Sequence, residues 1–311
     1  EAKVINWGAA LRDLRVPHEG GLQRVVLGLT RIEDYVAHSP HMGAIAGRFA
    51  NRIRNGRFSI DGADHALSLN QEGRHSLHGG VSGFGKRPWK IGAHEPGRIQ
   101  LTLHSADGDN GYPGALDVSC VYTLVGAATL RVELTATTDA PTIVNLATHS
   151  YFNLDGSPDV RDHELQIAAG FMTPVDSDLI PTGEIVSVAG TPFDFRAPRL
   201  VRHGSGQRYD HNFAIARRPD PATRLAHLAT LRSRFNGLGM ELHSTEPGLQ
   251  FYDGAKLAVP VAGHDGATYR AHAGLCLEPQ VFPDSPNYRH FPDATLRPGQ
   301  TYSQITEYRF G

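Results

Sequence analysis

Apolar and polar residues alternate along much of this chain with a period of two, the pattern of half-buried β-strands. The clearest alternations cover residues 98–104, 116–124, 129–136 and 302–310. Glycine (34 residues) and proline (20 residues) interrupt the chain, at intervals of roughly 8–12 residues that are typical of a sandwich or barrel. Helical periodicity is scarce, and only residues 34–37 favour a short turn of helix. The pattern therefore predicts an all-β fold.

Composition narrows the class of protein without changing that prediction. The 311 residues are 40% hydrophobic and 20% charged, which excludes disordered and fibrous classes. No linker, repeat or shift in composition divides the chain, so we expect one antiparallel domain over residues 1–311. A net charge of −2 provides no basic field, and no apolar run is long enough to span a bilayer. We therefore expect neither a nucleic-acid nor a membrane partner.

The two cysteines, Cys120 and Cys276, form neither a disulfide framework nor a zinc-type cysteine pair. Both lie in predicted strands, which favours buried thiols and indicates a reducing, cytoplasmic compartment. The visible N-terminus has neither the basic segment nor the apolar run of a signal peptide, although it also lacks an initiator Met. The sequence leaves the oligomeric state open, and we expect a monomer or a weak homodimer.

The most concentrated group of polar side chains lies in residues 145–156. If this stretch is extended, its period of two places four polar side chains on one face: Asn145, His149, Tyr151 and Asn153. The opposite face then carries Leu146, Phe152 and Leu154. Such a polar face is suited to bind a polyhydroxylated ligand. The alternative is a structural histidine beside a turn.

Two later stretches separate polar from apolar residues in the same way. In residues 274–284, Glu278 alternates with leucines, and Pro279 restricts it to extended geometry. A glutamate among apolar neighbours is partly desolvated, which raises the pKa of its carboxyl toward the range useful for proton transfer. In residues 248–254, Gln250 occupies the equivalent polar face. The alternative for Glu278 is an ordinary exposed strand residue.

Three shorter segments offer further polar candidates. Asn51 and Arg52 place an amide beside a guanidinium, which suits sugar hydroxyls or a carboxylate. His78 lies in a glycine turn, and Asp210 could accept hydrogen bonds from vicinal hydroxyls. Each signal is weak alone, because surface arginines and turn aspartates are common.

Several other chemistries have no support in the sequence. It contains no dinucleotide-binding or phosphate-loop motif, no His-Glu-x-x-His and no Gly-x-Ser-x-Gly. The histidine spacing gives no metal-ligand set. Of the 17 histidines, six have no chemical neighbourhood that favours a function, and we expect them to be surface or filler residues: His18, His38, His41, His104, His227 and His264.

Taken together, these segments resemble the aldose 1-epimerase (galactose mutarotase) family. The resemblance rests on Gly47-Arg-Phe-Ala-Asn-Arg-Ile53, Leu77-His-Gly-Gly80, His149-Ser-Tyr-Phe-Asn-Leu154, Tyr209-Asp-His-Asn-Phe213, Gly248-Leu-Gln-Phe-Tyr252 and a closing block from Leu277-Glu-Pro-Gln280 to Arg297-Pro-Gly299. The motifs occur in the family's order and cover nearly the whole chain. Two features depart from the family's pattern. One is Pro279, where the family more often has Thr. The other is residues 288–290, which put the sugar preference in doubt.

The resemblance implies a single large β-sandwich (supersandwich) of the galactose mutarotase type that interconverts the α- and β-anomers of free aldoses. It implies Glu278 as general base and His149 as general acid. The sugar-holding residues that it implies are Asn51, Arg52, His78, Asp210 and Gln250. It also implies catalysis without a metal or an organic cofactor, with a free monosaccharide as the partner.

Three other functions remain open from the sequence. A non-catalytic sugar-binding module could use the same sandwich. A sugar-phosphate epimerase would need a cationic cluster, of which only Arg52 and Arg54 are apparent. A glycosidase could pair Glu278 with Asp210 or Asp284. The sequence does not specify which aldose is preferred.

Overall fold

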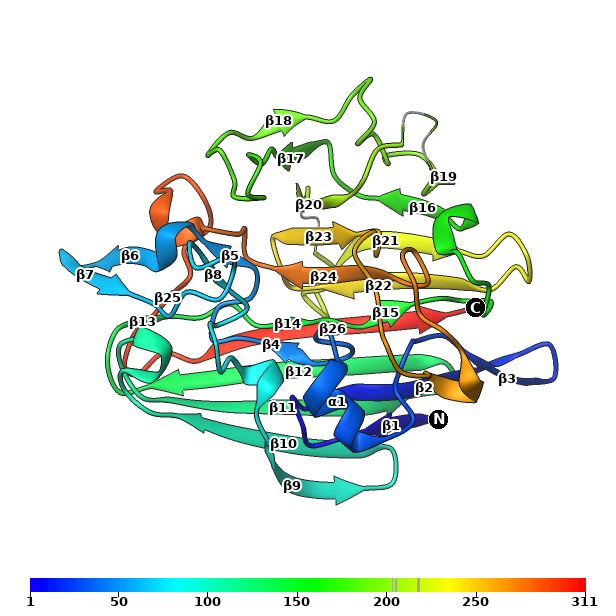
Figure 1. Ribbon diagram of the computed structural model, residues 1–311, viewed down its shortest axis with the longest axis horizontal. Helices are drawn as coiled ribbons and strands as arrows, with labels where there is room; N and C mark the ends of the chain where they lie inside the picture. Colours follow the sequence, from blue (N-terminus) through cyan, green and yellow to red (C-terminus); the bar gives the residue numbers. More distant parts are fainter. Residues whose placement is uncertain (203, 205, 217–218) are drawn as a thin grey trace.

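The computed structural model describes residues 1–202, 204, 206–216 and 219–311 (Figure 1). Two large antiparallel sheets dominate it, one of nine strands and one of six. In spatial order the larger sheet contains β19 (Arg199–Leu200), β16 (Glu164–Ile167), β21 (Ala226–Arg232), β22 (Gly239–Ser244), β26 (Tyr302–Phe310), β12 (Thr129–Thr138), β11 (Leu116–Val125), β10 (Arg98–Ser105) and β9 (Lys90–Glu95). The smaller sheet contains β15 (Tyr151–Phe152), β24 (Leu275–Gln280), β23 (Gly248–Tyr252), β20 (Asp210–Ala214), β17 (Phe171–Thr173) and β18 (Val186–Ser187).

Short strands and one short helix complete the described part of the fold. A three-stranded sheet consists of β1 (Ala2–Val4), β2 (Leu11–His18) and β3 (Gly21–Arg24). The two-stranded pairs are β13 (Thr142–Ile143) with β25 (Thr295–Leu296), β14 (Ala147–Thr148) with β4 (Ile45–Ala46), β5 (Arg52–Ile53) with β8 (Ser76–Leu77), and β6 (Arg57–Ile60) with β7 (Ala63–Ala66). The helix is α1 (Ile32–His38). Among the described residues, no helix is both long and apolar enough to cross a membrane.

The predicted all-β class is confirmed, and each of the four clearest alternations forms a strand. They correspond to β10, β11, β12 and β26. These four strands are consecutive neighbours in the nine-stranded sheet, in the spatial order β26, β12, β11, β10. The predicted turn of helix at residues 34–37 lies within α1. Both cysteines are buried in strands, as expected, and neither forms a disulfide.

One apolar core joins the two large sheets. The same cluster contains Leu134 from β12, Leu231 from β21, and Phe251 and Leu277 from the smaller sheet. The sheets therefore pack face to face as a sandwich, as expected from alternating strands with one apolar face each. This shared core supports the expectation of one domain over residues 1–311.

Strand β24 is covered on both faces, and this cover determines the chemistry of the site. All six of its residues are buried. Leu275 and Leu277 face the core, whereas Cys276 and Glu278 point to the other side, as the alternation predicted. On that side Glu278 shares a cavity with Arg52 of β5 and with His78, which directly follows β8. A polar strand face is thus buried beneath chain that lies 200 or more positions away from Glu278 in the sequence.

The stretch 145–154 is not the continuous strand that the alternation predicted. It forms two short strands, β14 paired with β4 and β15 paired with β24. The predicted core residues Leu146, Phe152 and Leu154 are fully buried. The predicted ligand-facing asparagine Asn153 instead closes a turn, donating to the carbonyls of Ser157 and Ala273. Buried loop backbone needs such partners, and that need overrides the period-two pattern.

Asn145 has a structural role for the same reason. Its side-chain amide donates to the carbonyl of Ala50 at 3.1 Å, and its Oδ1 accepts the backbone N–H of Val281 at 2.9 Å. The side chain is fully buried. Asn145 therefore links the segment that precedes Asn51 to the segment that follows β24.

We expect Asn145→Ala to lower the free energy of unfolding by about 2–4 kcal/mol, because it leaves at least two buried backbone groups without partners. Urea denaturation followed by circular dichroism measures the change. The exposed Asn6 supplies the control variant Asn6→Ala, which should change stability by no more than about 0.5 kcal/mol. Equal effects of the two substitutions would contradict the assigned role of Asn145.

Candidate active site

A cavity of about 180 Å³ lies over the outer face of the six-stranded sheet. Its lining residues are Pro40, His41, Asn51, Arg52, Leu77, His78, His149, Tyr151, Asp210, Tyr252, Lys256 and Glu278. The structure thus brings together six of the seven site residues predicted from the sequence. The seventh, Gln250, lies beside the cavity, where its amide donates to Asp210 Oδ1 at 2.6 Å. The volume is below the range of about 300–1,000 Å³ for drug-sized ligands and suits a smaller polar molecule.

Strand register positions the acidic and amide side chains. Gln250 of β23 is the cross-strand partner of Glu278 in β24, and Asp210 of β20 is the partner of Tyr252. Tyr151 of β15 lies opposite Cys276 on the other side of β24. Because cross-strand partners project to the same face, these side chains converge on one surface.

The central pair is His149 and Glu278. His149 Nε2 lies 3.9 Å from Glu278 Oε2, and both side chains are more than nine-tenths buried. On the other side of the imidazole, the thiol of Cys276 lies 3.6 Å from Nδ1. If the thiol donates to Nδ1 of a neutral imidazole, the ring proton is on Nε2, the nitrogen that faces Glu278.

Burial disfavours charge on both members of this pair. It raises the pKa of Glu278 well above its usual value, the negative charge of Asp210 adds to the rise, and Arg52 opposes it. Burial also lowers the pKa of His149 to about 4. Burial therefore favours the arrangement of this coupled pair in which neither group is charged.

Arg52 is held in position by three neighbours. Its Nε donates to Gln71 Oε1 at 2.8 Å, and its two terminal nitrogens lie 3.3 Å from Asn51 Oδ1 and 3.4 Å from Asp210 Oδ2. Three hydrogen bonds to one planar guanidinium fix its orientation over the cavity. The side chain is only 10% exposed, so its charge acts on Glu278 with little solvent screening.

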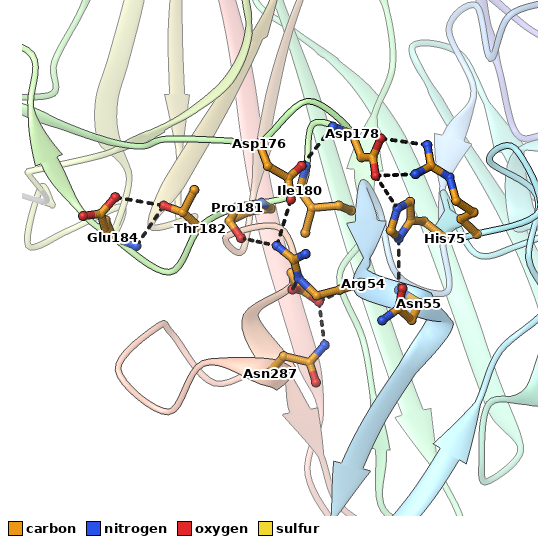
Figure 2. Close-up of polar contacts among 12 residues, drawn as sticks. Arg54, Asn55, His75, Asp176, Asp178, Ile180, Pro181, Thr182, Glu184 and Asn287 are labelled. Carbon is orange, nitrogen blue, oxygen red and sulfur yellow. Dashed lines mark hydrogen bonds and ion pairs between the residues drawn. The ribbon is translucent and has the colours of Figure 1, made fainter.

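A second polar network supports Gln71 from outside the cavity. Gln71 donates its amide to the carbonyl of Asp178 at 3.1 Å. Figure 2 shows that the carboxylate of Asp178 faces His75, and that Asp176 from the same loop contacts Arg54. The loop that follows β17 is thereby tied to the segment that carries Arg52.

His78 is fixed by backbone geometry. The N–H of Asn51 donates to its Nδ1 at 3.1 Å, so a neutral ring carries its proton on Nε2. The turn packs closely, because a Cβ on Gly79 (φ +86°) would lie 1.8 Å from the carbonyl oxygen of Gly47. Burial lowers the pKa of His78 well below its usual value, and the charges of His41 and His149 lower it further.

The assignment of His41 to the surface or filler residues is wrong. Its ring lies 4.8 Å from that of His78 and 5.9 Å from that of His149, and burial lowers its pKa to about 3. Nothing in the local sequence distinguishes it. Tyr252 and Lys256 also line the cavity. Tyr252 lies two positions after Gln250 on the same face of β23, as the alternation indicates, whereas Lys256 lies beyond the end of that strand and has no such signal.

Two features named from the sequence, residues 288–290 and Asp284, do not line the cavity. Residues 288–290 contact the loop at 181–183, where Tyr288 donates to the carbonyl of Pro181. Asp284 accepts the backbone N–H of Arg54 at 2.9 Å and does not line the cavity. A larger cavity of about 490 Å³ is lined by Arg24, but Asp13 and Asp265 already pair with that guanidinium.

A β-sandwich with a buried carboxyl–imidazole pair in a small polar cavity is suited to acid–base chemistry on a small polar ligand. The comparisons identify the family. Residues 1–309 match the sequence model of the aldose 1-epimerase family, so the chain belongs to that family.

Named relatives cover almost the whole chain. It is 42% identical over 316 residues to the galactose mutarotase of Homo sapiens, an alignment that covers 99% of this chain and 90% of the relative. It is 39% identical over 320 residues to the aldose 1-epimerase of Escherichia coli (strain K12), covering 99% and 91%. The crystal structure of an aldose epimerase homologue from C. elegans superposes with a TM-score of 0.93 at 32% identity, covering 100% of this chain and 95% of that one. The predicted resemblance and fold are confirmed.

We expect Asp210→Asn to lower the pKa of Glu278, because the substitution removes a negative charge that raises it. Nuclear magnetic resonance titration of the protein with ¹³C-labelled glutamate carboxyls measures the shift. Asp117→Asn is the control, since Asp117 is an exposed partner of His104. An unchanged or higher pKa in Asp210→Asn would contradict the electrostatic coupling.

Proposed function

We propose that this protein is an aldose 1-epimerase that interconverts the α- and β-anomers of free aldoses. The observation that carries the proposal is the 3.9 Å separation of His149 Nε2 and Glu278 Oε2 inside a sugar-sized cavity. The names of the relatives, galactose mutarotase and aldose 1-epimerase, support the same reaction.

The reaction needs one proton acceptor and one proton donor that lie close together. The C1 hydroxyl oxygen and the ring oxygen are both bonded to C1, so adjacent groups can reach both. Glu278 accepts the proton of the C1 hydroxyl while His149 protonates the ring oxygen. The C1–O5 bond then breaks, the aldehyde rotates about C1–C2, and the ring closes from the other face with the two roles reversed.

Burial assists ring opening in this scheme. The ring-closed sugar requires a carboxylate and an imidazolium, whereas the open chain leaves a neutral carboxyl and a neutral imidazole. Because burial raises the pKa of Glu278 and lowers the pKa of His149, it favours the neutral pair. The protein environment therefore favours the protonation state that ring opening produces.

The remaining lining residues supply binding. Asn51, Arg52 and His78 present donors from one side of the cavity, and Asp210 presents an acceptor from the sheet. Gln250, proposed from the sequence as a sugar ligand, is better placed to orient Asp210 through their 2.6 Å hydrogen bond. The acid–base pair itself contacts atoms that both anomers share.

The acid–base pair and the sugar-holding residues are all present in this one chain, which supports the expectation of a monomer or a weak homodimer. The two free, buried cysteines support a reducing, cytoplasmic location. The net charge of −2 supports the expectation that nucleic acid is not a partner.

Polarimetry, sugar binding and a glycoside cleavage assay together separate this proposal from its three alternatives. A sugar-binding module would bind aldoses without accelerating mutarotation. A sugar-phosphate epimerase would act faster on glucose 6-phosphate than on any free aldose. The cavity lining contains one arginine, Arg52, and one lysine, Lys256, and Arg52 is already paired with Asp210. A glycosidase would release the aglycone from a nitrophenyl glycoside. Of the two carboxylate partners considered for it, Asp284 lies off the lining.

We expect Glu278→Gln to lower kcat by roughly 10²–10⁴-fold with little change in sugar affinity, because the amide cannot accept a proton at neutral pH. His149→Gln should cause a comparable loss. The double variant should lose less than the product of both effects, because acid and base act in one step. Optical rotation of freshly dissolved α-D-galactose or α-D-glucose, corrected for the spontaneous reaction, gives the rates.

The control variant Glu241→Gln changes an exposed strand glutamate that pairs with His243, and it should retain full activity. Circular dichroism and sugar binding establish that each variant is folded. A folded, sugar-binding Glu278→Gln variant with more than about a tenth of the kcat would remove Glu278 from the mechanism.

The pH profile of kcat/KM should be bell-shaped, because the active pair holds one proton. Activity rises with pH at the lower apparent pKa of the coupled pair, where its second proton is lost, and falls at the higher one, where its last proton is lost. Burial of Glu278 and the negative charge of Asp210 raise the higher of the two. Asp210→Asn should move the falling limb to lower pH. A falling limb that moves to higher pH in this variant would contradict the assignment.

A further inference from the structure

Three chemically different metal-ligand atoms converge beside the cavity, which His149 and Glu278 line. One atom each from His149, Cys276 and Glu278 lies within 4.8 Å of the other two, and all three residues are buried. Cys276 and Glu278 are two positions apart on β24 and therefore share its outer face. The thiol has no part in the proton transfers described above.

The spacing of the sulfur and nitrogen donors matches that of a tetrahedral site for a soft cation. Zinc binds imidazole nitrogen at about 2.0–2.1 Å and thiolate sulfur at about 2.3 Å, which places the two donors about 3.6 Å apart at a tetrahedral angle. His149 Nδ1 and Cys276 Sγ are 3.6 Å apart.

Glu278 supplies a second and independent observation. Its Oε2 is buried, and no other described group forms a hydrogen bond with it. A buried carboxylate oxygen without a partner is costly and is stabilised by a cation. The negative charge of Asp210 lies close enough to act on Glu278, and it adds to the attraction, which Arg52 partly opposes.

We propose that His149, Cys276 and Glu278 bind a thiophilic divalent cation, zinc above all, and that the bound ion inhibits the enzyme. Thiolate and imidazole donors select zinc over magnesium or calcium, which prefer oxygen ligands. Cys276 binds as the thiolate and its proton passes to solvent. The fourth position faces the cavity and is open to water or a sugar hydroxyl. Because the ion occupies both the acid and the base, it blocks proton transfer.

This site is inhibitory and does not alter the expectation that catalysis itself requires no metal. The inhibition rests on the proposed epimerase function, whereas the binding site does not. A spectroscopic experiment on binding and a kinetic experiment on inhibition therefore separate a failure of this inference from a failure of the proposed function.

Binding is tested with cobalt(II) as a coloured substitute for zinc. Titration of the chelator-treated, full-length protein should produce a thiolate-to-cobalt charge-transfer band in the near ultraviolet and the strong visible bands of a tetrahedral site. Zinc should abolish both sets of bands. Absence of the charge-transfer band in the folded wild-type protein would overturn the proposed ligand set.

Two cysteine variants provide a matched comparison. Cys276→Ser should lose the charge-transfer band, and Cys120→Ser should retain it, because Cys120 is buried in β11 of the nine-stranded sheet and is not part of the donor cluster. A band that persists in Cys276→Ser or disappears in folded Cys120→Ser would assign the thiolate elsewhere and overturn the proposal.

Inhibition is measured by polarimetry, with each variant compared with its own metal-free rate. Zinc should inhibit the wild-type enzyme reversibly, and a chelator should restore the rate. Cys276→Ser should raise the zinc concentration for half inhibition by at least about tenfold, equivalent to roughly 1.4 kcal/mol of binding free energy. Equal zinc sensitivity in wild-type and Cys276→Ser proteins would contradict inhibition through this site.

Discussion

Removal of the Glu278 carboxyl from water is the constraint on which the rest of the site depends. The strand that carries Glu278 is covered on one face by the core and on the other by the segment that contains Arg52 and His78. Burial in that position disfavours charge on the carboxyl and on the imidazole beside it. An enclosed pair of this kind exchanges one proton with the ligand and gains no net charge, which is well suited to a reaction whose product is an isomer of its substrate.

The charges around this pair are arranged so that they compensate one another. Arg52 lies between Asp210 and the hydrogen-bond acceptors of Asn51 and Gln71. Its cation offsets part of the repulsion between Asp210 and Glu278. Asp178, in the loop at 174–181, does not line the cavity. Its carbonyl accepts a hydrogen bond from Gln71, which in turn positions the guanidinium of Arg52. Orientation of the ligand therefore depends on residues outside the cavity.

The alternation of side chains was sufficient to predict four strands of the nine-stranded sheet and the face on which Glu278 and Gln250 lie, because strand periodicity is a local property. It was misleading at Asn145 and Asn153, where buried backbone groups required side-chain partners that only the three-dimensional path of the chain reveals. It was uninformative at His41, which follows a short helix and reaches the cavity only through tertiary packing. The motif resemblance supplied what periodicity could not, namely which separate segments meet.

The cover over β24 also has a consequence for how the protein acquires activity. The cavity combines Asn51 and His78 with Glu278, so more than half of the chain must be synthesised and folded between the first and last of these residues. Contacts so distant in sequence form late and slowly in β-proteins. Partly folded chains then contain strands but no assembled proton-transfer pair. Catalysis during refolding would thus report when the segment that contains Arg52 and His78 packs over β24, a step that secondary-structure signals do not detect.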